Sequence, residues 1–220
     1  MTALERNYSL AHLREDLVWA NLLSAPTTSV RPAVFLDRDG VVIEERGYLS
    51  SPNGVTLIAG AAESIGRAAA RGYMIVIVSN QSGIGRGFFD WNAYKMIEER
   101  MFALLADCGA YVDLSLACAH HPDGLSPYNV EHPWRKPEPG MLLEARRILN
   151  LDLERSLMVG DKASDIAAAR AAGLRRAFLT ATGHGKNETN AAANLRRPDF
   201  CVSFIASIDD LLRCDETSKT

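Results

Sequence analysis

No run of apolar residues in this 220-residue sequence approaches the ~20 residues that a membrane-spanning helix needs. Neither sign of charge dominates, because 24 basic and 27 acidic side chains leave a net charge of −3. Such a balance gives no reason to expect nucleic acid or an anionic membrane as the main partner. Charged residues interrupt residues 1–23 throughout, so we do not expect a signal peptide there.

Cysteine is scarce and scattered along the chain. Its four cysteines, Cys108, Cys118, Cys201 and Cys214, form no disulfide framework. We therefore expect a reducing, cytoplasmic setting for this protein.

The chain also lacks a clear linker, an internal repeat and a low-complexity tract. It is 47% hydrophobic, which is enough for one packed core at this length. We predict a single domain over residues 31–214, preceded by an N-terminal extension over residues 1–30. Leu10, Leu13 and Leu17 recur near helical spacing, so we expect this extension to be an amphipathic helix packed on the body or on a partner subunit.

Short apolar segments alternate with helical stretches over the rest of the chain. The predicted strands cover residues 33–37, 73–80, 113–120, 156–161, 175–180 and 200–207. The predicted helices cover residues 60–71, 91–107, 139–150 and 163–172. Near-continuous apolar strands separated by helices predict an α/β fold, with a central parallel sheet covered on both faces.

Polar residues gather at the predicted carboxyl ends of the strands, which is where such sheets bind their ligands. The first strand ends in Asp37 and Asp39, the second in Ser79 and Asn80, the third in a loop that holds Cys118, His120, Arg135 and Lys136, and the fourth in Asp161 and Lys162. This clustering indicates a functional site at one edge of the sheet.

The acidic residues at these ends predict a metal site. Asp37 and Asp39 alone would more often be two solvated loop acids, but Asp161 adds a third carboxylate at the same edge. Three converging carboxylates repel one another unless a cation offsets their charge. Mg²⁺ suits them, because it prefers oxygen ligands and commonly works beside a phosphate.

The neighbouring residues predict phosphate chemistry. Ser79 and Asn80 offer hydrogen-bond donors ahead of a glycine-rich turn, and Lys136 offers a positive charge. One assignment uses all of these groups: Asp37 attacks phosphorus and forms an aspartyl-phosphate. Asp39 then protonates the leaving alkoxide and later takes a proton from water, while Asp37 and Asp161 hold Mg²⁺.

Four segments resemble the motifs of the haloacid dehalogenase (HAD) phosphatases. They read DRDGV, SNQSG, RKPEPGM and VGDKASD, and they occur in that family's order across residues 33–180. The resemblance implies a three-layer, Rossmann-like HAD fold. It also implies that the backbone carbonyl of Asp39 ligates magnesium, and that Asp165 lies in the next shell, where it orients Lys162 or a metal-bound water.

The sequence is most similar to the branch of D-glycero-D-manno-heptose 1,7-bisphosphate phosphatases and histidinol-phosphate phosphatases. This branch implies a small cap, which agrees with the short segment between Asp39 and Ser79. It implies removal of the 7-phosphate of the heptose bisphosphate, with histidinol phosphate or another small sugar phosphate as the alternative substrate. Arg135 and Lys136 resemble the contacts to the substrate phosphate. We expect a monomer or a small homo-oligomer.

Two other functions remain open at this point. A non-catalytic phosphate-binding module is disfavoured, because such a module has no need of Asp39 beside Asp37. A phosphomutase would have to keep water from the intermediate, and the sequence shows no large lid for that purpose.

The loop over residues 118–136 departs from the family pattern. In the family, Cys-x-His and a later Cys-x-Cys bind a structural zinc. Here Cys118 and His120 match the first pair, but the second pair reads His132 and Trp134, and tryptophan is not a ligand. Either Cys118, His120 and His132 hold zinc with an unidentified fourth ligand, or the loop packs around Trp134 without metal.

Overall fold

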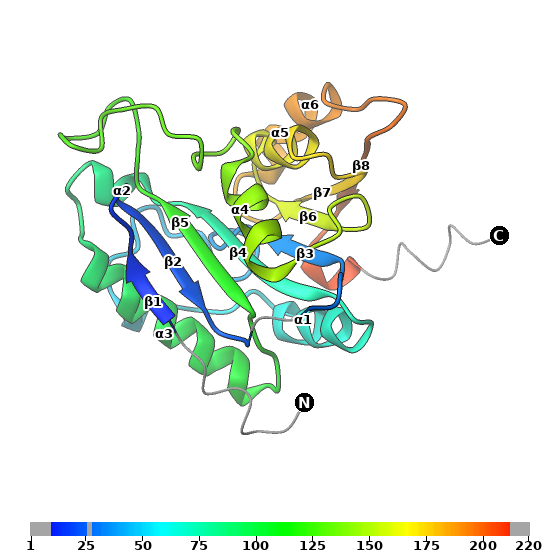
Figure 1. The fold of residues 1–220 in the computed structure, drawn as a ribbon, viewed down its shortest axis with the longest axis horizontal. Helices are drawn as coiled ribbons and strands as arrows, with labels where there is room; N and C mark the ends of the chain where they lie inside the picture. Colours follow the sequence, from blue (N-terminus) through cyan, green and yellow to red (C-terminus); the bar gives the residue numbers. More distant parts are fainter. Residues whose placement is uncertain (1–9, 26–27, 212–220) are drawn as a thin grey trace.

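The structure of the protein, a computed structural model, describes residues 10–25 and 28–211. Within these residues, eight strands form one sheet in the order β1-β2-β5-β4-β3-β6-β7-β8 (Figure 1). The strands are β1 (Leu10–Leu13), β2 (Val18–Leu22), β3 (Ala33–Leu36), β4 (Met74–Asn80), β5 (Leu114–Cys118), β6 (Leu157–Gly160), β7 (Arg176–Thr180) and β8 (Cys201–Ile205). The six strands from β3 to β8 pair in parallel, which confirms the predicted α/β architecture.

The path of the chain through the sheet determines where a ligand can bind. From the central strand β3 the chain runs outward through β4 to β5, and then returns to β6 on the other side of β3. In open α/β sheets, the crevice beyond the carboxyl ends at such a reversal is the binding site. The end of β3, at Asp37, therefore lies at the expected position of the site.

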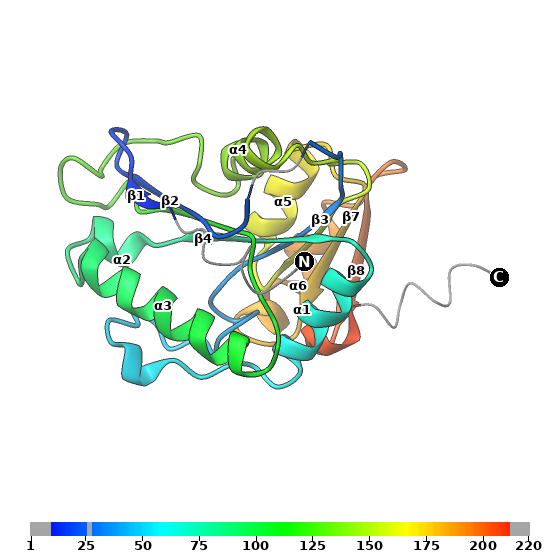
Figure 2. The ribbon, with the colours of Figure 1, turned by 60° about the horizontal axis from the view of Figure 1, so that its bottom comes forward.

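Helices cover both faces of the sheet, as Figure 2 shows. They are α1 (Ala61–Ala70), α2 (Ser82–Gly85), α3 (Trp91–Asp107), α4 (Gly140–Leu149), α5 (Ala163–Ala171) and α6 (Gly185–Ala193), with the short 3-10 helices η2 (Pro52–Gly54) and η3 (Ile208–Asp210). Strand β3 alternates between the two layers: Ala33 and Phe35 pack with α4 and α5, whereas Val34 and Leu36 pack with α1 and α3.

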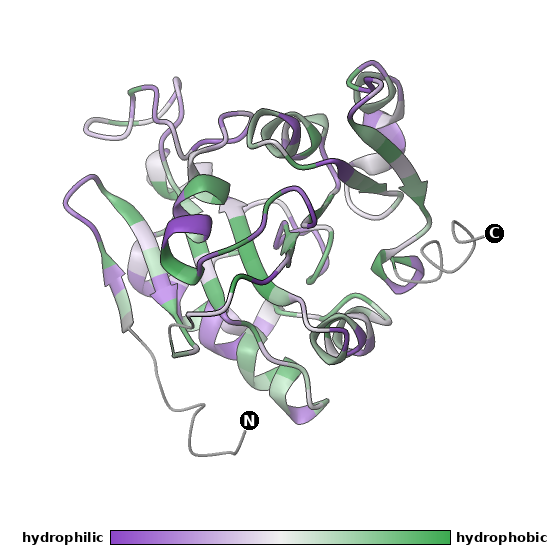
Figure 3. Ribbon diagram, turned by 45° about the vertical axis from the view of Figure 1, so that its right-hand side comes forward, coloured by the Kyte–Doolittle hydropathy of each residue, from purple (hydrophilic) through white to green (hydrophobic). Residues whose placement is uncertain are grey.

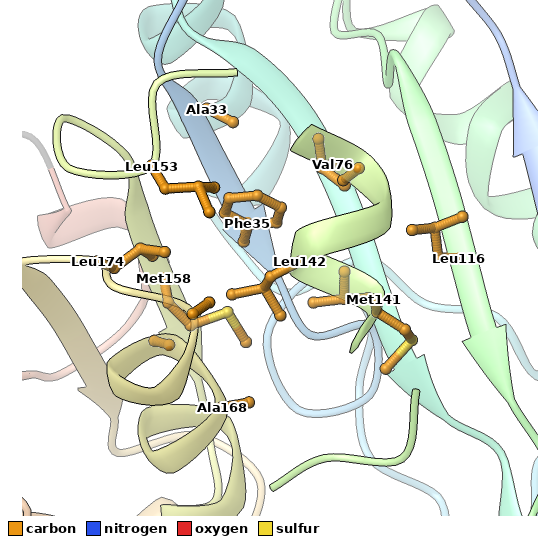
Figure 4. Packing of buried hydrophobic residues seen from close by; sticks show 14 of the residues in the cluster. Ala33, Phe35, Val76, Leu116, Met141, Leu142, Leu153, Met158, Ala168 and Leu174 are labelled. Carbon is orange, nitrogen blue, oxygen red and sulfur yellow. The ribbon is translucent and has the colours of Figure 1, made fainter. Parts of the chain in front are cut away.

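The two hydrophobic layers fix the sheet in place. In one layer, Met141 and Leu142 of α4 pack over Phe35 and Val76, with Met158 beside them (Figure 4). All five side chains are buried. Figure 3 shows that hydrophobic residues run through the central strands, while hydrophilic residues lie on the outer faces of helices and in parts of the loops. The buried strands therefore end at a polar edge.

The N-terminal extension is not the predicted amphipathic helix. Residues 10–22 form a β-hairpin whose second strand, β2, pairs antiparallel with β5; residues 1–9 lie outside the described residues. Without β2, the edge of β5 would expose unpaired backbone groups, and pairing with β2 satisfies them. Leu17 lies in the turn with φ 60°, so the leucine spacing reflects a hairpin turn and two strands.

The segment between β3 and β4 is short. Within the described residues it holds η2, α1 and an antiparallel bridge between Ile43 and Leu57, and it contains no cap domain. This agrees with the predicted minimal cap and leaves the carboxyl edge of the sheet accessible. No helix in residues 10–25 and 28–211 has the length and apolar character to span a membrane.

Candidate active site

A cavity of about 310 Å³ lies over the carboxyl ends of the central strands. Its lining includes Asp37, Asp39, Glu45, Tyr48, Asn80, Gln81, Phe89, Lys136, Lys162, Ser164, Asp165 and His184. This volume falls within the range of small-molecule sites. A larger cavity of about 520 Å³ lies at the opposite edge of the sheet, between α1 and α3, and does not include any residue predicted for the site.

Lys136 joins two of the buried acids at the floor of the cavity. Its Nζ lies 3.0 Å from Asp37 Oδ1 and 2.7 Å from Asp165 Oδ1, and it donates to the carbonyl of Val78 at 2.7 Å. Burial opposes the charge of Lys136, but Asp165 and Asp37 outweigh this effect and raise the pKa of Lys136. The lysine is therefore a fixed positive charge beside Asp37.

Asn80 positions the backbone of that lysine. Its side-chain amide donates to the carbonyl of Lys136 at 2.9 Å and accepts from the Lys136 N–H at 3.0 Å. This reciprocal pair joins the end of β4 to the loop that carries Lys136. These bonds engage the Asn80 amide with the Lys136 backbone, and the expected contact of Asn80 with phosphate stays a prediction.

Asp161 has the properties of a cation ligand. One of its oxygens accepts the N–H of His184 at 2.8 Å, and its buried Oδ1 has no hydrogen-bond partner in residues 10–25 and 28–211. Burial, together with the charge of Asp37, raises the pKa of Asp161 to about 7. Ligand oxygens of Asp37, Asp161 and Asp165 lie within 4.8 Å of one another. A divalent cation offsets such crowding, so the residues fit Mg²⁺.

Close backbone packing shapes the surroundings of Asp161. Gly40 and Gly183 both have positive φ, 81° and 55°, and a Cβ on either glycine would overlap the Asp161 carboxylate. Gly40, the glycine of the DRDG segment, is therefore required because Asp161, which follows β6, packs directly against it.

Asp39 is held by two neighbours. The Arg38 guanidinium lies on its carboxylate, with Nη2 2.9 Å from Oδ2, and Gln81 Nε2 donates to Oδ2 at 2.9 Å. The Asp39 side chain keeps 15% of its surface exposed and lines the cavity, while the Arg38 side chain is only 2% exposed. The structure thus places Asp37 and Asp39 at one cavity with different partners.

Two of the predicted phosphate contacts do not line the cavity. Ser79 is buried, and its hydroxyl accepts from Gln81 at 2.8 Å. Arg135 donates to the carbonyl of His120 at 2.9 Å, within the same loop over residues 118–136. Lys136 and Asn80 do line the cavity, as do Lys162 and Asp165. The phosphate contacts expected of Ser79 and Arg135 both stay predictions.

Several residues that line the cavity were given no role by the sequence analysis, among them Gln81, His184 and Glu45. Gln81 directly follows β4, and its contacts to Asp39 and Ser79 are not visible in a motif. His184 follows β7, whose carboxyl end lies at the same edge, so extending the comparison of strand ends to this fifth strand would have found it. Glu45 lies in the loop after β3, and its Oε2 is 3.7 Å from Nε2 of His184.

The residues predicted for zinc lie near one another but do not fit a tetrahedral site. The rings of His120 and His132 stack at 4.5 Å, and Cys118 Sγ lies 4.0 Å from His132 Nδ1. That same Nδ1 accepts the N–H of Trp134, and burial raises the pKa of Cys118 to about 11. The ligand atoms of Cys118, His120 and His132 do not form one of the convergent groups found among the described residues, and His132 Nδ1 is already engaged. The structure therefore favours the alternative of a loop packed around buried Trp134.

We expect purified protein, prepared without added zinc, to contain well below one zinc per chain. Cys118→Ser should then lower the melting temperature by only a few degrees, because it places a hydroxyl in an apolar cluster but removes no metal ligand. Metal analysis and thermal melts test this, with the exposed Cys108→Ser as the control. Stoichiometric zinc that disappears in Cys118→Ser would contradict the packed-loop arrangement.

Comparisons with known proteins agree with this geometry. A family described as HAD-hydrolase-like matches residues 133–208. A D-glycero-beta-D-manno-heptose-1,7-bisphosphate 7-phosphatase of Mesorhizobium japonicum is 46% identical over 183 residues, which are 83% of this chain and 84% of that protein. The protein of the same name from Vibrio cholerae is 42% identical over 163 residues, or 74% of this chain and 88% of the relative.

Solved structures give the same result. A HAD-like phosphatase from Mesorhizobium loti has a TM-score of 0.79 at 37% identity, covering 91% of this chain and 93% of its own. The D,D-heptose 1,7-bisphosphate phosphatase of B. bronchiseptica, solved with magnesium and phosphate, has a TM-score of 0.74 at 29% identity, covering 85% of this chain and 99% of its own. The chain belongs to the HAD-like phosphatases, in the branch that contains the heptose-bisphosphate 7-phosphatases.

Proposed function

We propose that this protein removes the 7-phosphate of D-glycero-D-manno-heptose 1,7-bisphosphate in a Mg²⁺-dependent reaction. The observation that carries the proposal is that Asp37 and Lys136 line one cavity, with buried Asp161 in the carboxylate cluster beside Asp37, on a chain 46% identical to a named heptose-bisphosphate phosphatase. The cluster supplies a carboxylate nucleophile, oxygen ligands for a cation, and a fixed positive charge.

Asp37 is positioned to attack phosphorus. Its Oδ1 accepts the N–H of Arg38 at 2.8 Å and lies beside Lys136, so attack through Oδ2 leaves both contacts intact. An O–P bond then forms to Asp37 as the P–O bond to the sugar breaks, giving an aspartyl-phosphate. Lys136 lies close enough to Asp37 to attract the oxygens of the phosphoryl group during this transfer.

Asp39 moves the protons. In the first step it donates a proton to the departing sugar oxygen, and in the second it accepts one from the water that attacks the aspartyl-phosphate. Its partly exposed carboxylate lines the same cavity as Asp37, as both steps require. Release of phosphate then leaves Asp37 as a free carboxylate and Asp39 protonated for the next cycle.

Asp37, Asp161 and the Asp39 carbonyl are the groups that would hold Mg²⁺ in this site. When bound, the ion neutralises charge on the phosphoryl oxygens. Asp165 remains with Lys136 and with the backbone N–H of Lys162, at 3.0 Å from its Oδ2. Its contacts suit a residue that positions its neighbours.

The test is phosphate release from the heptose bisphosphate and from histidinol phosphate, measured in parallel with Mg²⁺ and with chelator. We expect the bisphosphate to be preferred at least tenfold, by about 1.4 kcal/mol or more of transition-state binding. Lys162 and His184 line the cavity beside Lys136, and such basic groups favour an additional phosphate over the ammonium group of histidinol. Preference for histidinol phosphate would identify the alternative substrate.

Asp161→Asn should raise the Mg²⁺ concentration that gives half-maximal activity by at least about tenfold, because a neutral amide is a weaker ligand than a carboxylate. Activity titrations with MgCl₂ measure this, with the exposed Asp199→Asn as the control. An unchanged Mg²⁺ dependence, or wild-type activity in excess chelator, would exclude Asp161 as a ligand.

A further inference from the structure

Arg38, between the two catalytic aspartates, is one of the most deeply buried charged side chains in the described residues, at 2% exposure. Its Nε lies 3.2 and 3.1 Å from the two oxygens of Asp39, and its Nη2 lies 3.0 Å from Oδ1. One edge of the guanidinium thus faces the whole carboxylate. A lysine could not reproduce this contact, because an ammonium group is a point charge without the planar fork.

While Nε and Nη2 of Arg38 contact Asp39, the third guanidinium nitrogen is left without a hydrogen bond among the described residues. This Nη1 atom is buried and has no hydrogen-bond partner within residues 10–25 and 28–211. Burying such a donor without a partner is unfavourable, so other interactions must hold the guanidinium in place. Gln81 is one of them: its Oε1 accepts from Nη2 at 3.2 Å, while its Nε2 donates to Asp39.

Buried side chains of β2 and α3 behind Arg38 supply the other interactions that hold its guanidinium in place. The guanidinium lies 5.1 Å from the ring centroid of Tyr94, whose hydroxyl is 3.4 Å from the buried Glu98. Glu98 also accepts from Trp19 at 3.1 Å and from Asn21 at 2.9 Å, both on β2. The N-terminal hairpin is therefore connected, through packed groups, to a residue that contacts Asp39.

The side chain of Arg38 is not needed to shape its own loop. The carbonyl of Arg38 accepts the N–H groups of Val42 and Ile43, both at 3.0 Å, and these bonds do not involve the guanidinium. The backbone contacts thus account for the turn after β3, and the buried fork requires a separate explanation.

We propose that Arg38 is a positioning residue that holds the Asp39 carboxylate in the orientation for proton transfer to and from the sugar oxygen. This inference rests on the proposed role of Asp39. Proton transfer needs donor and acceptor within hydrogen-bond reach, and a carboxylate free to rotate spends less time in that geometry. The effect of losing Arg38 should therefore depend on how much the leaving group needs a proton.

The experiment measures kcat/KM for Arg38→Met, Arg38→Lys and Asp39→Asn on p-nitrophenyl phosphate, phenyl phosphate and an alkyl phosphate. We expect Arg38→Met to lose roughly 10- to 100-fold on the alkyl phosphate and less than about threefold on p-nitrophenyl phosphate, a smaller version of the Asp39→Asn pattern. Arg38→Lys should fall between wild type and Arg38→Met. The matched control is Arg67→Met on α1, which breaks an ion pair with Asp209 and should show no dependence on the leaving group.

Each outcome decides between explanations. An equal loss on all three substrates in Arg38→Met, with a selective loss in Asp39→Asn, would overturn the positioning role of Arg38 and leave the role of Asp39 in place. No loss on any substrate in Arg38→Met would have the same meaning. If Asp39→Asn itself shows no selectivity, the proposed function of Asp39 has failed. If a thermal melt shows that Arg38→Met does not fold, the same comparison is made with Arg38→Lys.

Discussion

Asp37→Asn should abolish phosphate release from every substrate, by roughly 10⁶-fold, the order of loss that follows removal of a catalytic nucleophile. An amide oxygen does not attack phosphorus, so the aspartyl-phosphate cannot form. Neither a better leaving group nor more Mg²⁺ should restore turnover, because both act after a nucleophile is in place. Assays with p-nitrophenyl phosphate and with the heptose bisphosphate measure the loss.

The variant should remain folded, which separates lost chemistry from lost structure. Asparagine keeps an oxygen that accepts the N–H of Arg38, and Lys136 keeps its contact with Asp165. The substitution also removes one of three crowded carboxylates, so repulsion within the cluster decreases. A melting temperature close to that of the wild type is therefore expected. Residual activity above about 1% of the wild type would contradict the role of Asp37 as nucleophile.

The strand ends of this site could be predicted from the sequence. Asp37, Asn80 and Asp161 each follow or end a buried apolar strand, and parallel strands bring their carboxyl ends to one edge. The alternation of such strands with helices was enough to predict the sheet. Lys136 was singled out by its motif, and in the structure it lines the same cavity as Asp37 and Asn80.

The N-terminal hairpin could not be predicted from local pattern. Leu10, Leu13 and Leu17 fit a helix in isolation, and only the open edge of β5 makes a strand more favourable there. That edge is created by residues far later in the chain, at Leu114–Cys118. Tertiary pairing overrides local periodicity in such a case.

The hydrogen-bond partners of polar residues in the site also could not be predicted from local sequence. Ser79 and Asn80 carry hydrogen-bonding groups that suit phosphate, yet in the structure their partners are Gln81 and Lys136. The residue type fixes which bonds a side chain can make, and the packing of the loop 118–136 against β4 decides which it does make. A sequence motif thus identifies the groups of a site more reliably than their contacts.

Asp39→Asn should convert the enzyme into one that reacts once and then stalls, if the leaving group departs without a proton. The amide keeps the nucleophile Asp37 and the Asp39 backbone carbonyl, and it removes proton transfer, which is typically worth about 10²–10⁴-fold. Because p-nitrophenolate leaves unaided, Asp37 is phosphorylated rapidly. The water that attacks the aspartyl-phosphate still lacks its base, so the second step is slow.

The expected record is a rapid burst of p-nitrophenol, near one per active site, followed by slow turnover. The heptose bisphosphate should give no burst, since its departing alkoxide needs a proton that the substituted amide cannot supply. A stopped-flow trace with enzyme at substrate-like concentration measures both, and the wild type and Asp37→Asn serve as controls. A burst in Asp37→Asn with an inert Asp39→Asn would mean that the two roles are reversed. Full activity in both variants would place the chemistry at another site. The two carboxylates line one cavity with different partners. Only a division of roles, with Asp37 as nucleophile and Asp39 as acid and base, predicts a burst in one variant alone.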